Sequence, residues 1–229
     1  MPVAIVTGGS KGLGRAIALD LAHAGWSVVI GGRTAGPLAE VAASITDAGG
    51  TVEALVGDVA DAAHRESLVR AADRFGSLDL LVSNASSLGP SPLPRLDRYP
   101  LEALRDVYEV NVVAPLALVQ SALPLLRRSG GVVVAISSDA AVESYEGWGG
   151  YGSSKAALDQ LHHVLAAEEP GLRVYVFDPG DMRTEMHQAA FPGEDISDRP
   201  PPESVLPSLR ALLASELPSG RYRTSEVLA

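Results

Sequence analysis

Tyr151 and Lys155 are the residues of this chain whose side-chain types and spacing are best suited to catalysis. They stand four positions apart in Tyr151-Gly-Ser-Ser-Lys155, and Ser138 lies thirteen residues before the tyrosine. Positions i and i+4 share one face of a helix, so the phenol and the ammonium would lie side by side. A free tyrosine has a pKa near about 10, and a neighbouring cation favours the phenolate and lowers that pKa. The spacing predicts a proton-transfer pair, although by itself it fits a chance pairing on an exposed helix equally well.

A glycine-rich turn, Thr7-Gly-Gly-Ser-Lys-Gly-Leu-Gly14, lies near the start of the chain. It follows residues 3–7, whose β-branched side chains predict a buried strand, and it leads into a segment with apolar residues at helical spacing. The free N–H groups and partial positive charge of a helix N-terminus attract phosphate, and glycines let the backbone approach a pyrophosphate closely. The turn is therefore a candidate phosphate-binding site. Because it occurs in the same chain as the Tyr/Lys pair, a chance pairing of those two residues is disfavoured.

An alternation of strands and helices must position these residues. We expect strands near residues 3–7, 27–32, 52–57, 79–83, 131–137, 172–178 and 220–225, and helices near 12–24, 36–48, 62–74, 101–128, 152–168 and 203–216. Alternation with short connections predicts an α/β fold, a single-domain Rossmann-like doubly wound parallel sheet of about seven strands flanked by helices. Ligands bind at the carboxyl ends of such strands, and each of five motif residues follows a predicted strand: Gly8, Asp58, Asn84, Ser138 and Pro179.

Composition limits the classes of partner. The 229 residues are most simply one domain over 1–229, and the net charge of −10 argues against nucleic acid as a partner. The absence of cysteine rules out disulfides and thiolate metal sites, and it fits a cytoplasmic location without proving it. We expect no membrane-spanning run and no leader segment. His162-His163 is interpreted as a surface or interface pair, so no metal site is predicted.

The glycine spacing G-x-x-x-G-x-G, taken with the Ser/Tyr/Lys set, resembles the short-chain dehydrogenase/reductase family over roughly residues 3–185. The resemblance implies an NAD(P)-dependent oxidoreductase that acts on the CH–OH or C=O group of a small molecule. By the same resemblance, Ser138 hydrogen-bonds the substrate carbonyl oxygen and stabilises its developing charge. Tyr151 gives that oxygen a proton during reduction, and Lys155 lowers the tyrosine pKa and holds the nicotinamide ribose.

Asn111 completes the implied catalytic set. It lies within the long predicted helix, in Val110-Asn-Val-Val-Ala114, and would position a water that links Lys155 to solvent. An asparagine inside a helix is locally unfavourable, which supports a specific role, although a helix kink or a buried cap would also account for it. Ser137 is the rival for the role of Ser138, and the thirteen-residue gap to the tyrosine favours Ser138.

The resemblance also assigns the cofactor contacts. Asp58-Val59 corresponds to the adenine contact, and Thr184 would meet the nicotinamide carboxamide. Asn84-Ala85 matches the middle of the family's Asn-Asn-Ala-Gly segment, which reads Ser83-Asn-Ala-Ser86 here. The full set of implied cofactor-binding residues is Gly8, Ser10, Lys11, Gly12, Leu13, Gly14, Arg33, Asp58, Val59, Asn84, Ala85, Tyr151, Lys155, Pro179, Gly180, Met182 and Thr184.

Charge indicates which form of the cofactor is used. Family members that bind NAD usually carry an acidic residue at the end of the second strand, where it accepts from the ribose 2′-hydroxyl. Here that strand ends Ile30-Gly-Gly-Arg33, without an acid. Arg33, with Lys11 in the glycine turn, would suit a 2′-phosphate. We therefore predict NADP(H), with NAD(H) as the alternative if Arg33 is only a solvated turn residue.

Segments around residues 147–148, 165–170 and 178–184 are similar to the sepiapterin-reductase branch of the family, whose members reduce vicinal dicarbonyls. The stretch 219–224 lacks an acidic residue to anchor a pterin, so the branch suggests only a carbonyl or dicarbonyl substrate. The substrate contacts we expect are Ser138 and Tyr151, with Tyr145, Trp148 and Phe191 as the wall of the site. For the last three, ordinary core or interface packing is an equal alternative.

Family members commonly pair through the two helices expected here at 101–128 and 152–168, which implies a homodimer. The short polar tail 224–229 lacks the strand end that many tetrameric members use, although a tetramer stays open. The alternative to an enzyme is a catalytically silent NADP(H)-sensing binding protein on the same fold, because fold alone does not separate the two. A sensor has no need of the tyrosine, and the complete Asn/Ser/Tyr/Lys set favours the enzyme.

Overall fold

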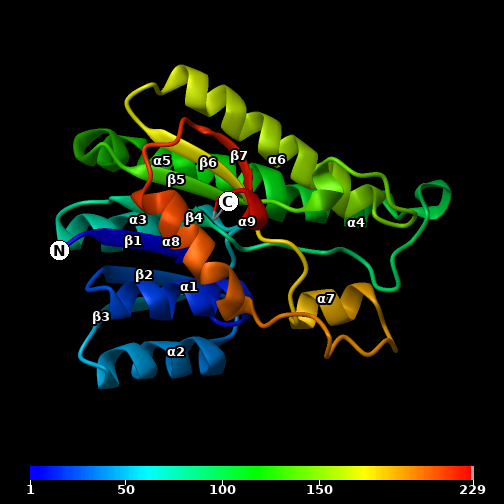
Figure 1. Ribbon diagram of the computed structural model, residues 1–229, viewed down its shortest axis with the longest axis horizontal. Coiled ribbons are helices and arrows are strands. Elements are labelled where there is room, and N and C mark those ends of the chain that lie inside the picture. The colour runs from blue at the N-terminus through cyan, green and yellow to red at the C-terminus, as the bar shows by residue number, and fades with distance from the viewer. Residues whose placement is uncertain (228–229) are drawn as a thin grey trace.

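A seven-stranded parallel sheet forms the middle layer of the protein, in the order β3-β2-β1-β4-β5-β6-β7 (Figure 1). The structure is a computed structural model that describes residues 1–227. The strand order reverses between β1 and β4, which makes the carboxyl ends of these two strands the switch point where such sheets bind ligands. The strands are β1 (Val3–Thr7), β2 (Ser27–Gly32), β3 (Thr51–Val56), β4 (Leu80–Ser83), β5 (Val132–Ile136), β6 (Arg173–Asp178) and β7 (Gly220–Arg223).

Helices cover both faces of this sheet, which is why its central strands are buried end to end (Figure 1). One face carries α1 (Gly12–His23), α2 (Ala35–Asp47) and α8 (Leu206–Ala214). The other carries α3 (Ala62–Phe75), α5 (Ala114–Ser129) and α6 (Gly149–Glu168). The remaining elements are η1 (Leu96–Arg98), α4 (Leu101–Tyr108), η2 (Glu109–Val113), η3 (Asp139–Ala141), α7 (Glu185–Ala190), η4 (Pro202–Val205) and α9 (Thr224–Val227).

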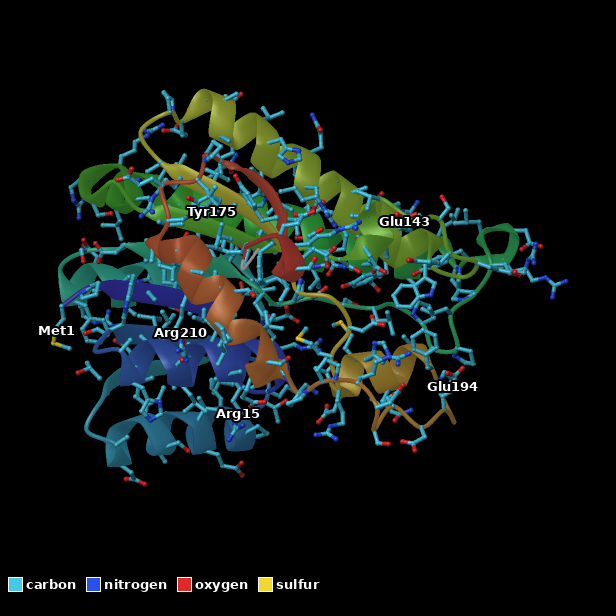
Figure 2. The ribbon with its side chains drawn as sticks, viewed as in Figure 1. Met1, Arg15, Glu143, Tyr175, Glu194 and Arg210 are labelled. Carbon is cyan, nitrogen blue, oxygen red and sulfur yellow. The ribbon has the colours of Figure 1, made fainter. Side chains whose placement is uncertain are left out.

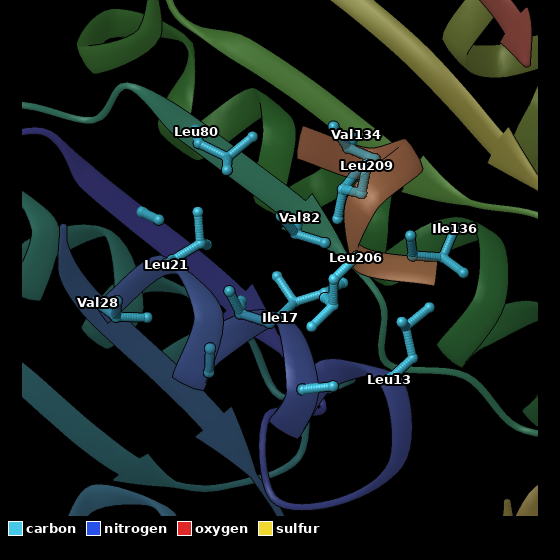
Figure 3. Close-up of a cluster of buried hydrophobic side chains, with 14 of the residues drawn as sticks. Leu13, Ile17, Leu21, Val28, Leu80, Val82, Val134, Ile136, Leu206 and Leu209 are labelled. Atoms are coloured by element: carbon cyan, nitrogen blue, oxygen red, sulfur yellow. The ribbon is translucent and has the colours of Figure 1, made fainter. Parts of the chain in front are cut away.

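The core beneath α1 and α8 is built from aliphatic side chains at helical spacing (Figure 3). Leu13, Ile17 and Leu21 of α1 face the sheet together with Leu206 and Leu209 of α8. They pack on strand residues of the same face, among them Val28, Leu80, Val82, Val134 and Ile136. An ion pair closes the outer edge, where Arg210 of α8 donates through Nε to Asp20 Oδ2 at 2.8 Å (Figure 2 labels Arg210). This packing fixes the start of α1, where the glycine turn lies.

Several elements differ from the expectation, among them the helix expected over 203–216, which divides into η4 and α8. The helix expected over 101–128 is interrupted by η2, a π-helical segment in which the N–H of Ala114 bonds the carbonyl of Glu109. The short helix α7 was missing from the expected elements, and Thr184 caps it by accepting from the N–H of His187 at 3.2 Å. The strand expected at 220–225 ends at Arg223, where α9 begins. The last two residues of the 1–229 domain and of the 224–229 tail lie outside the described residues.

The stretch Leu101–Ser129 corrects the expectation that no segment has membrane-spanning length. It is 29 residues long with a mean hydropathy of 1.5 in its most apolar window, enough for a span by length and composition alone. Its apolar side chains have another use, because Leu118, Ala122 and Leu125 of α5 are buried in the core against the sheet. The apolar composition of the stretch is therefore accounted for by its packing on one face of the sheet.

Candidate active site

The glycine turn joins β1 to α1 and needs glycine for two different reasons. Gly8 and Gly12 have φ of +67° and +54°, in the left-handed region that other residues avoid. Gly14 has an ordinary φ, but a Cβ there would lie 2.3 Å from the carbonyl oxygen of Gly8. No side chain caps the first turn of α1, so its N–H groups stay free for an anion. The turn thus presents bare backbone donors at the switch point of the sheet.

Asn84 ties this turn to the neighbouring strand. Its Nδ2 donates to the carbonyl of Thr7 at 2.9 Å and to that of Gly8 at 3.3 Å. In return the Thr7 hydroxyl accepts the N–H groups of Asn84 and Ala85, each at 3.0 Å. The departures from the family's segment at Ser83 and Ser86 therefore leave the β4 loop firmly attached to the glycine turn.

A cleft of about 540 Å³ runs from this turn along the carboxyl ends of the strands. At one end it is lined by Lys11, Arg33, Asp58 and Val59, and at the other by Ser138 and Tyr151. The expected cofactor residues that line it are Gly8, Ser10, Lys11, Gly12, Leu13, Arg33, Asp58, Val59, Asn84, Ala85, Tyr151, Lys155, Pro179, Gly180, Met182 and Thr184. Gly14 lies behind the surface, where its role is the close approach to Gly8.

The cationic end of the cleft carries Lys11 and Arg33, both exposed. Lys11 forms an ion pair with Glu185 at the start of α7, so in this structure it bridges the glycine turn and that short helix. Arg15 also lines the cleft, although in the sequence it is only one polar position in the amphipathic pattern of α1. These three cations lie beyond the end of β2, where their charge favours an anion.

Tyr151 and Lys155 lie on one face of α6, as their spacing predicts. Both are buried, with 8% and 2% of their surface exposed, and the Lys155 Nζ lies 5.6 Å from the centre of the tyrosine ring. Lys155 Nζ donates to the carbonyl of Ile136 at 2.7 Å, which anchors it to the end of β5. The phenol and the ammonium therefore form a fixed pair at the inner end of the cleft.

The buried environment of this pair affects the pKa of both groups. Burial raises the pKa of Tyr151 well above its usual value, and the neighbouring Ser86 hydroxyl only partly opposes this. Burial also lowers the pKa of Lys155 to about 8, against the raising influence of Asp159. We expected Lys155 to lower the tyrosine pKa; in the chain alone the desolvation of the buried phenol outweighs any such effect.

Ser138 and Ser137 are distinguished by where their hydroxyls lie. Ser138 is half-buried in the cleft lining, and its Oγ donates to Asp139 Oδ1 at 2.9 Å. Ser137 also borders the cleft, but it is 2% exposed and its hydroxyl oxygen is buried. This arrangement favours Ser138 for contact with a substrate, in agreement with the spacing argument.

Asn111 does not line the cleft, and its side chain is fully engaged inside the protein. It lies in η2 with 1% of its surface exposed. Its Oδ1 accepts from the Ser86 hydroxyl at 3.1 Å and from the Ser87 N–H at 2.7 Å. Its Nδ2 donates to the Ser87 carbonyl at 2.8 Å and to the Ser154 hydroxyl at 2.9 Å. Asn111 therefore joins the β4 loop to α6 at Ser154, the residue that precedes Lys155.

Of the three aromatic residues expected in the substrate wall, Trp148 lines the cleft. Its ring lies edge-on to Tyr151, with centroids 5.7 Å apart. Phe191 and Tyr145 pack against Trp148 at 5.9 and 6.4 Å and support it from behind. Tyr145 is 47% exposed, and its hydroxyl donates to Asp139 Oδ2 at 2.9 Å.

Sequence reasoning missed several side chains at the substrate end, namely Ser86, Leu88, Met186 and His187. They come from the β4 loop and from α7, two segments without periodicity, and only Ser86 belongs to a motif, at the end of the Ser83–Ser86 segment. His162 was also misjudged, because it is buried and its Nδ1 contacts the carbonyl of Leu158. Burial lowers the pKa of His162 to about 4, so its ring is neutral. Within residues 1–227 we find no cluster of three or more His, Asp or Glu side chains that could hold a metal ion.

A parallel sheet with a glycine turn at its switch point and a Tyr–Lys pair across the cleft defines a dinucleotide-dependent enzyme of the Rossmann type. The model of the short chain dehydrogenase family matches residues 2–195. The Escherichia coli uncharacterized oxidoreductase YciK is 34% identical over 211 residues, covering 90% of this chain and 83% of the relative. Mouse sepiapterin reductase is 33% identical over 222 residues, covering 91% and 84%.

A short chain dehydrogenase of Shigella flexneri, solved in complex with NADP, superimposes with a TM-score of 0.91. It is 29% identical and the match covers 98% of this chain and 97% of that one. The chain belongs to the short-chain dehydrogenase/reductase family, and it is an NAD(P)-dependent oxidoreductase of that type. The family and the fold expected from the sequence are thereby confirmed.

Proposed function

We propose that this protein reduces a carbonyl group of a small molecule to an alcohol, or catalyses the reverse reaction, with NADP(H) as cofactor. The observation that carries the proposal is the buried Tyr151–Lys155 pair at the inner end of a cleft whose other end is cationic. The residues present fit the dinucleotide. The N–H groups at the start of α1 are uncapped, and a Cβ at Gly8 would meet Asn84 and Ala85 at 2.9 and 3.0 Å, so the turn offers backbone and no side-chain bulk.

The cofactor supplies the hydride, and the chain supplies placement and the proton. Ser138 would donate a hydrogen bond to the substrate oxygen and stabilise the charge that develops on it. Tyr151 would give that oxygen its proton; the raised pKa of the buried phenol means that the proton is present at neutral pH. Lys155 would hold the nicotinamide ribose, and Asn111 keeps the adjoining β4 loop and α6 in place through its four hydrogen bonds.

NADP(H) is favoured over NAD(H) by charge. Arg33 follows β2 at the point where an acidic residue would serve NAD, and Lys11 and Arg15 line the same end of the cleft. A 2′-phosphate would form charge-assisted hydrogen bonds with these cations. The Shigella relative bound to NADP is consistent with this preference.

The substrate is proposed to be a ketone or dicarbonyl with an apolar body. The wall near Tyr151 consists of Leu88, Ala190 and Trp148, with Met186 and Phe191 packed against them. Such a surface binds hydrocarbon or aromatic rings, whereas Ser138 and Tyr151 would contact the carbonyl oxygen. The resemblance to mouse sepiapterin reductase supports the same class of substrate.

We further propose a cytoplasmic homodimer formed through the α4–α5 stretch and α6. Exposed apolar side chains lie on these helices: Leu101, Val113 and Val164 are 65%, 47% and 42% exposed. A tetramer is the alternative, and sedimentation at several protein concentrations separates the two.

The test of the activity is absorbance at the reduced-nicotinamide band with NADPH and with NADH against diketones, quinones, pterins and simple ketones. Turnover with NADPH would support the reaction and the roles of Lys11 and Arg33. Turnover with NADH instead would overturn the cofactor preference. Tight NADPH binding without turnover would favour the sensing protein, which uses the same cleft and leaves Tyr151 without a function.

A further inference from the structure

Arg221 of β7 reaches across the edge of the sheet to the rear of the active site. Its Nε donates to Asp159 Oδ2 at 3.2 Å, and its Nη2 donates to Asp178 Oδ2 at 2.8 Å. The same Nη2 donates to the backbone carbonyl of Ser138 at 2.9 Å. One guanidinium thus holds together the end of β6, the start of η3 and the middle of α6.

These charges are buried, unlike most ion pairs of this protein. The side chains of Arg221, Asp159 and Asp178 are 17%, 8% and 4% exposed. Desolvation makes a buried ion pair a weak source of stability, and apolar residues of similar volume would often serve the fold as well or better. The cluster therefore calls for an explanation besides stability.

Asp159 links the cluster to Lys155. The two residues are four positions apart on α6 and so share its inward face. The carboxylate raises the pKa of Lys155, opposing the effect of burial that brings it to about 8. Burial raises the pKa of Asp159, and the hydrogen bond and positive charge of Arg221 oppose that rise and favour the ionised carboxylate. Arg221 therefore keeps a negative charge in place behind the lysine.

We propose that Arg221 and Asp159 are positioning residues of the active site: Arg221 fixes the Ser138 backbone and the Asp159 carboxylate, and Asp159 supplies a buried counter-charge one helical turn from Lys155. The inference rests on the proposed function for the roles of Ser138 and Lys155. Neither positioning residue lines the cleft, so each acts through a neighbour.

Titratable and charged groups from several elements surround Lys155. On α6 itself the neighbours are Tyr151, Asp159 and His162, the last of which is neutral. From the other elements around the pair, the charged groups are Asp139 after β5, Asp178 at the end of β6, and Arg221 and Arg223 of β7. Asp159 is the charge that acts directly on the lysine.

Asp159→Asn tests the counter-charge. Without the carboxylate the pKa of Lys155 falls further, so the ammonium is lost at a lower pH. In NADPH-driven reduction the alkaline limb of kcat/KM should move down by about one pH unit or more. The Kd for NADPH, measured by fluorescence over the same pH range, should begin to rise at the same lower pH. Well below the pKa of Lys155 the variant should match the wild type.

Arg221→Met tests the hold on Ser138, with Arg221→Lys as the conservative variant. Misplacing the serine should lower kcat by about tenfold to a hundredfold, with a smaller effect on KM, and lysine should restore part of the loss. Arg223→Met is the matched control. Arg223 is 42% exposed, lies 3.7 Å from Asp178, and has no bond to Ser138 or Asp159, so this variant should keep wild-type kinetics.

An alkaline limb that stays in place in Asp159→Asn, by turnover and by NADPH binding, would overturn the role of Asp159. Wild-type kcat in Arg221→Met would overturn that of Arg221. If Arg221→Met fails to fold, the Arg221→Lys and Asp159→Asn profiles decide the matter. If the wild type binds NADPH and reduces no carbonyl of the panel, the proposed function fails, yet the pH dependence of NADPH binding still tests Asp159.

Discussion

The two ends of the cleft are built by different means. The phosphate end consists of backbone: Gly8 and Gly12 in left-handed conformations, Gly14 in close contact, and Asn84 bonded to carbonyls. The proton-transfer end consists of buried side chains held by partners far away in the sequence. Arg221, for example, is 83 positions from the Ser138 carbonyl that it bonds.

This difference determines how each end responds to change. A backbone cradle depends on conformation and space, so a single methyl group can damage it. A buried ionisable pair depends on desolvation and on nearby charges, so changes that keep its shape can still alter its chemistry. Four substitutions, taken in order of expected effect, would separate these two modes.

Tyr151→Phe should have the largest effect, and it should be confined to chemistry. The variant keeps the ring against Trp148 and removes the proton donor. We expect kcat to fall by about 10²- to 10⁴-fold. The Kd for NADPH, from fluorescence titration, should stay close to that of the wild type. Tyr222→Phe is the matched control, because that hydroxyl bonds only the Pro218 carbonyl outside the cleft. A wild-type rate in Tyr151→Phe would show that another group delivers the proton.

Gly14→Ala should damage the phosphate end through sterics alone. The new Cβ would lie 2.3 Å from the Gly8 oxygen and 2.4 Å from Asn84 Nδ2, so the turn must shift. We expect a loss of about 1–3 kcal/mol in the free energy of unfolding, measured with denaturant, together with weaker NADPH binding. Gly36→Ala in α2 is the control; nothing lies within 4 Å of the added atom, and helix propensity improves there. Equal stability of the two variants would contradict the close-approach argument.

Arg33→Ala should separate the two cofactors. Losing a charge-assisted bond to the 2′-phosphate should weaken NADPH binding by about tenfold or more and leave NADH binding unchanged. The two Kd values, measured side by side, give the ratio directly. Arg98→Ala on the exposed η1 segment should alter neither. An equal loss of affinity for both cofactors would mean that Arg33 stabilises the turn and does not contact the 2′-phosphate.

Glu185→Gln should have the smallest effect, and it should strengthen NADPH binding, whereas Gly14→Ala and Arg33→Ala should weaken it. Its carboxylate pairs with Lys11 on the surface, where both side chains are mostly exposed and the pair contributes little. Removing it frees Lys11, so NADPH should bind about twofold to fivefold more tightly at low salt, with the gain lost at high salt. Glu102→Gln, which breaks a similar exposed pair with Arg105, should leave the Kd unchanged. Weaker NADPH binding would indicate that the pair helps to hold the cleft closed.

The sequence predicts the phosphate end better than the proton-transfer end, and the reason is locality. The glycine turn between a strand and a helix and the shared face of Tyr151 and Lys155 follow from spacings of a few residues. The sheet follows from β-branched runs that alternate with amphipathic helices. In all these cases the determining residues are neighbours in the chain.

What escaped prediction depends on contacts between distant segments. The burial that raises the pKa of Tyr151 arises where distant segments pack together, and no spacing reveals it. In the sequence, Arg221 is one of two arginines that flank Tyr222, a pattern that predicts no buried role. The pairing of β6 with β7 places it beside Asp178. The helix α7 is six residues long and too short for a periodic signal.

The π-helical segment η2 can be regarded as one residue inserted into an otherwise regular helix. Each residue turns an α-helix by about 100°, so the insertion rotates α4 relative to α5 by that amount. Deleting a single residue from 109–113 would restore a regular helix and turn Asn111 away from Ser87 and Ser154. Chain length in these five positions, as much as side-chain identity, therefore sets whether this asparagine joins the β4 loop to α6.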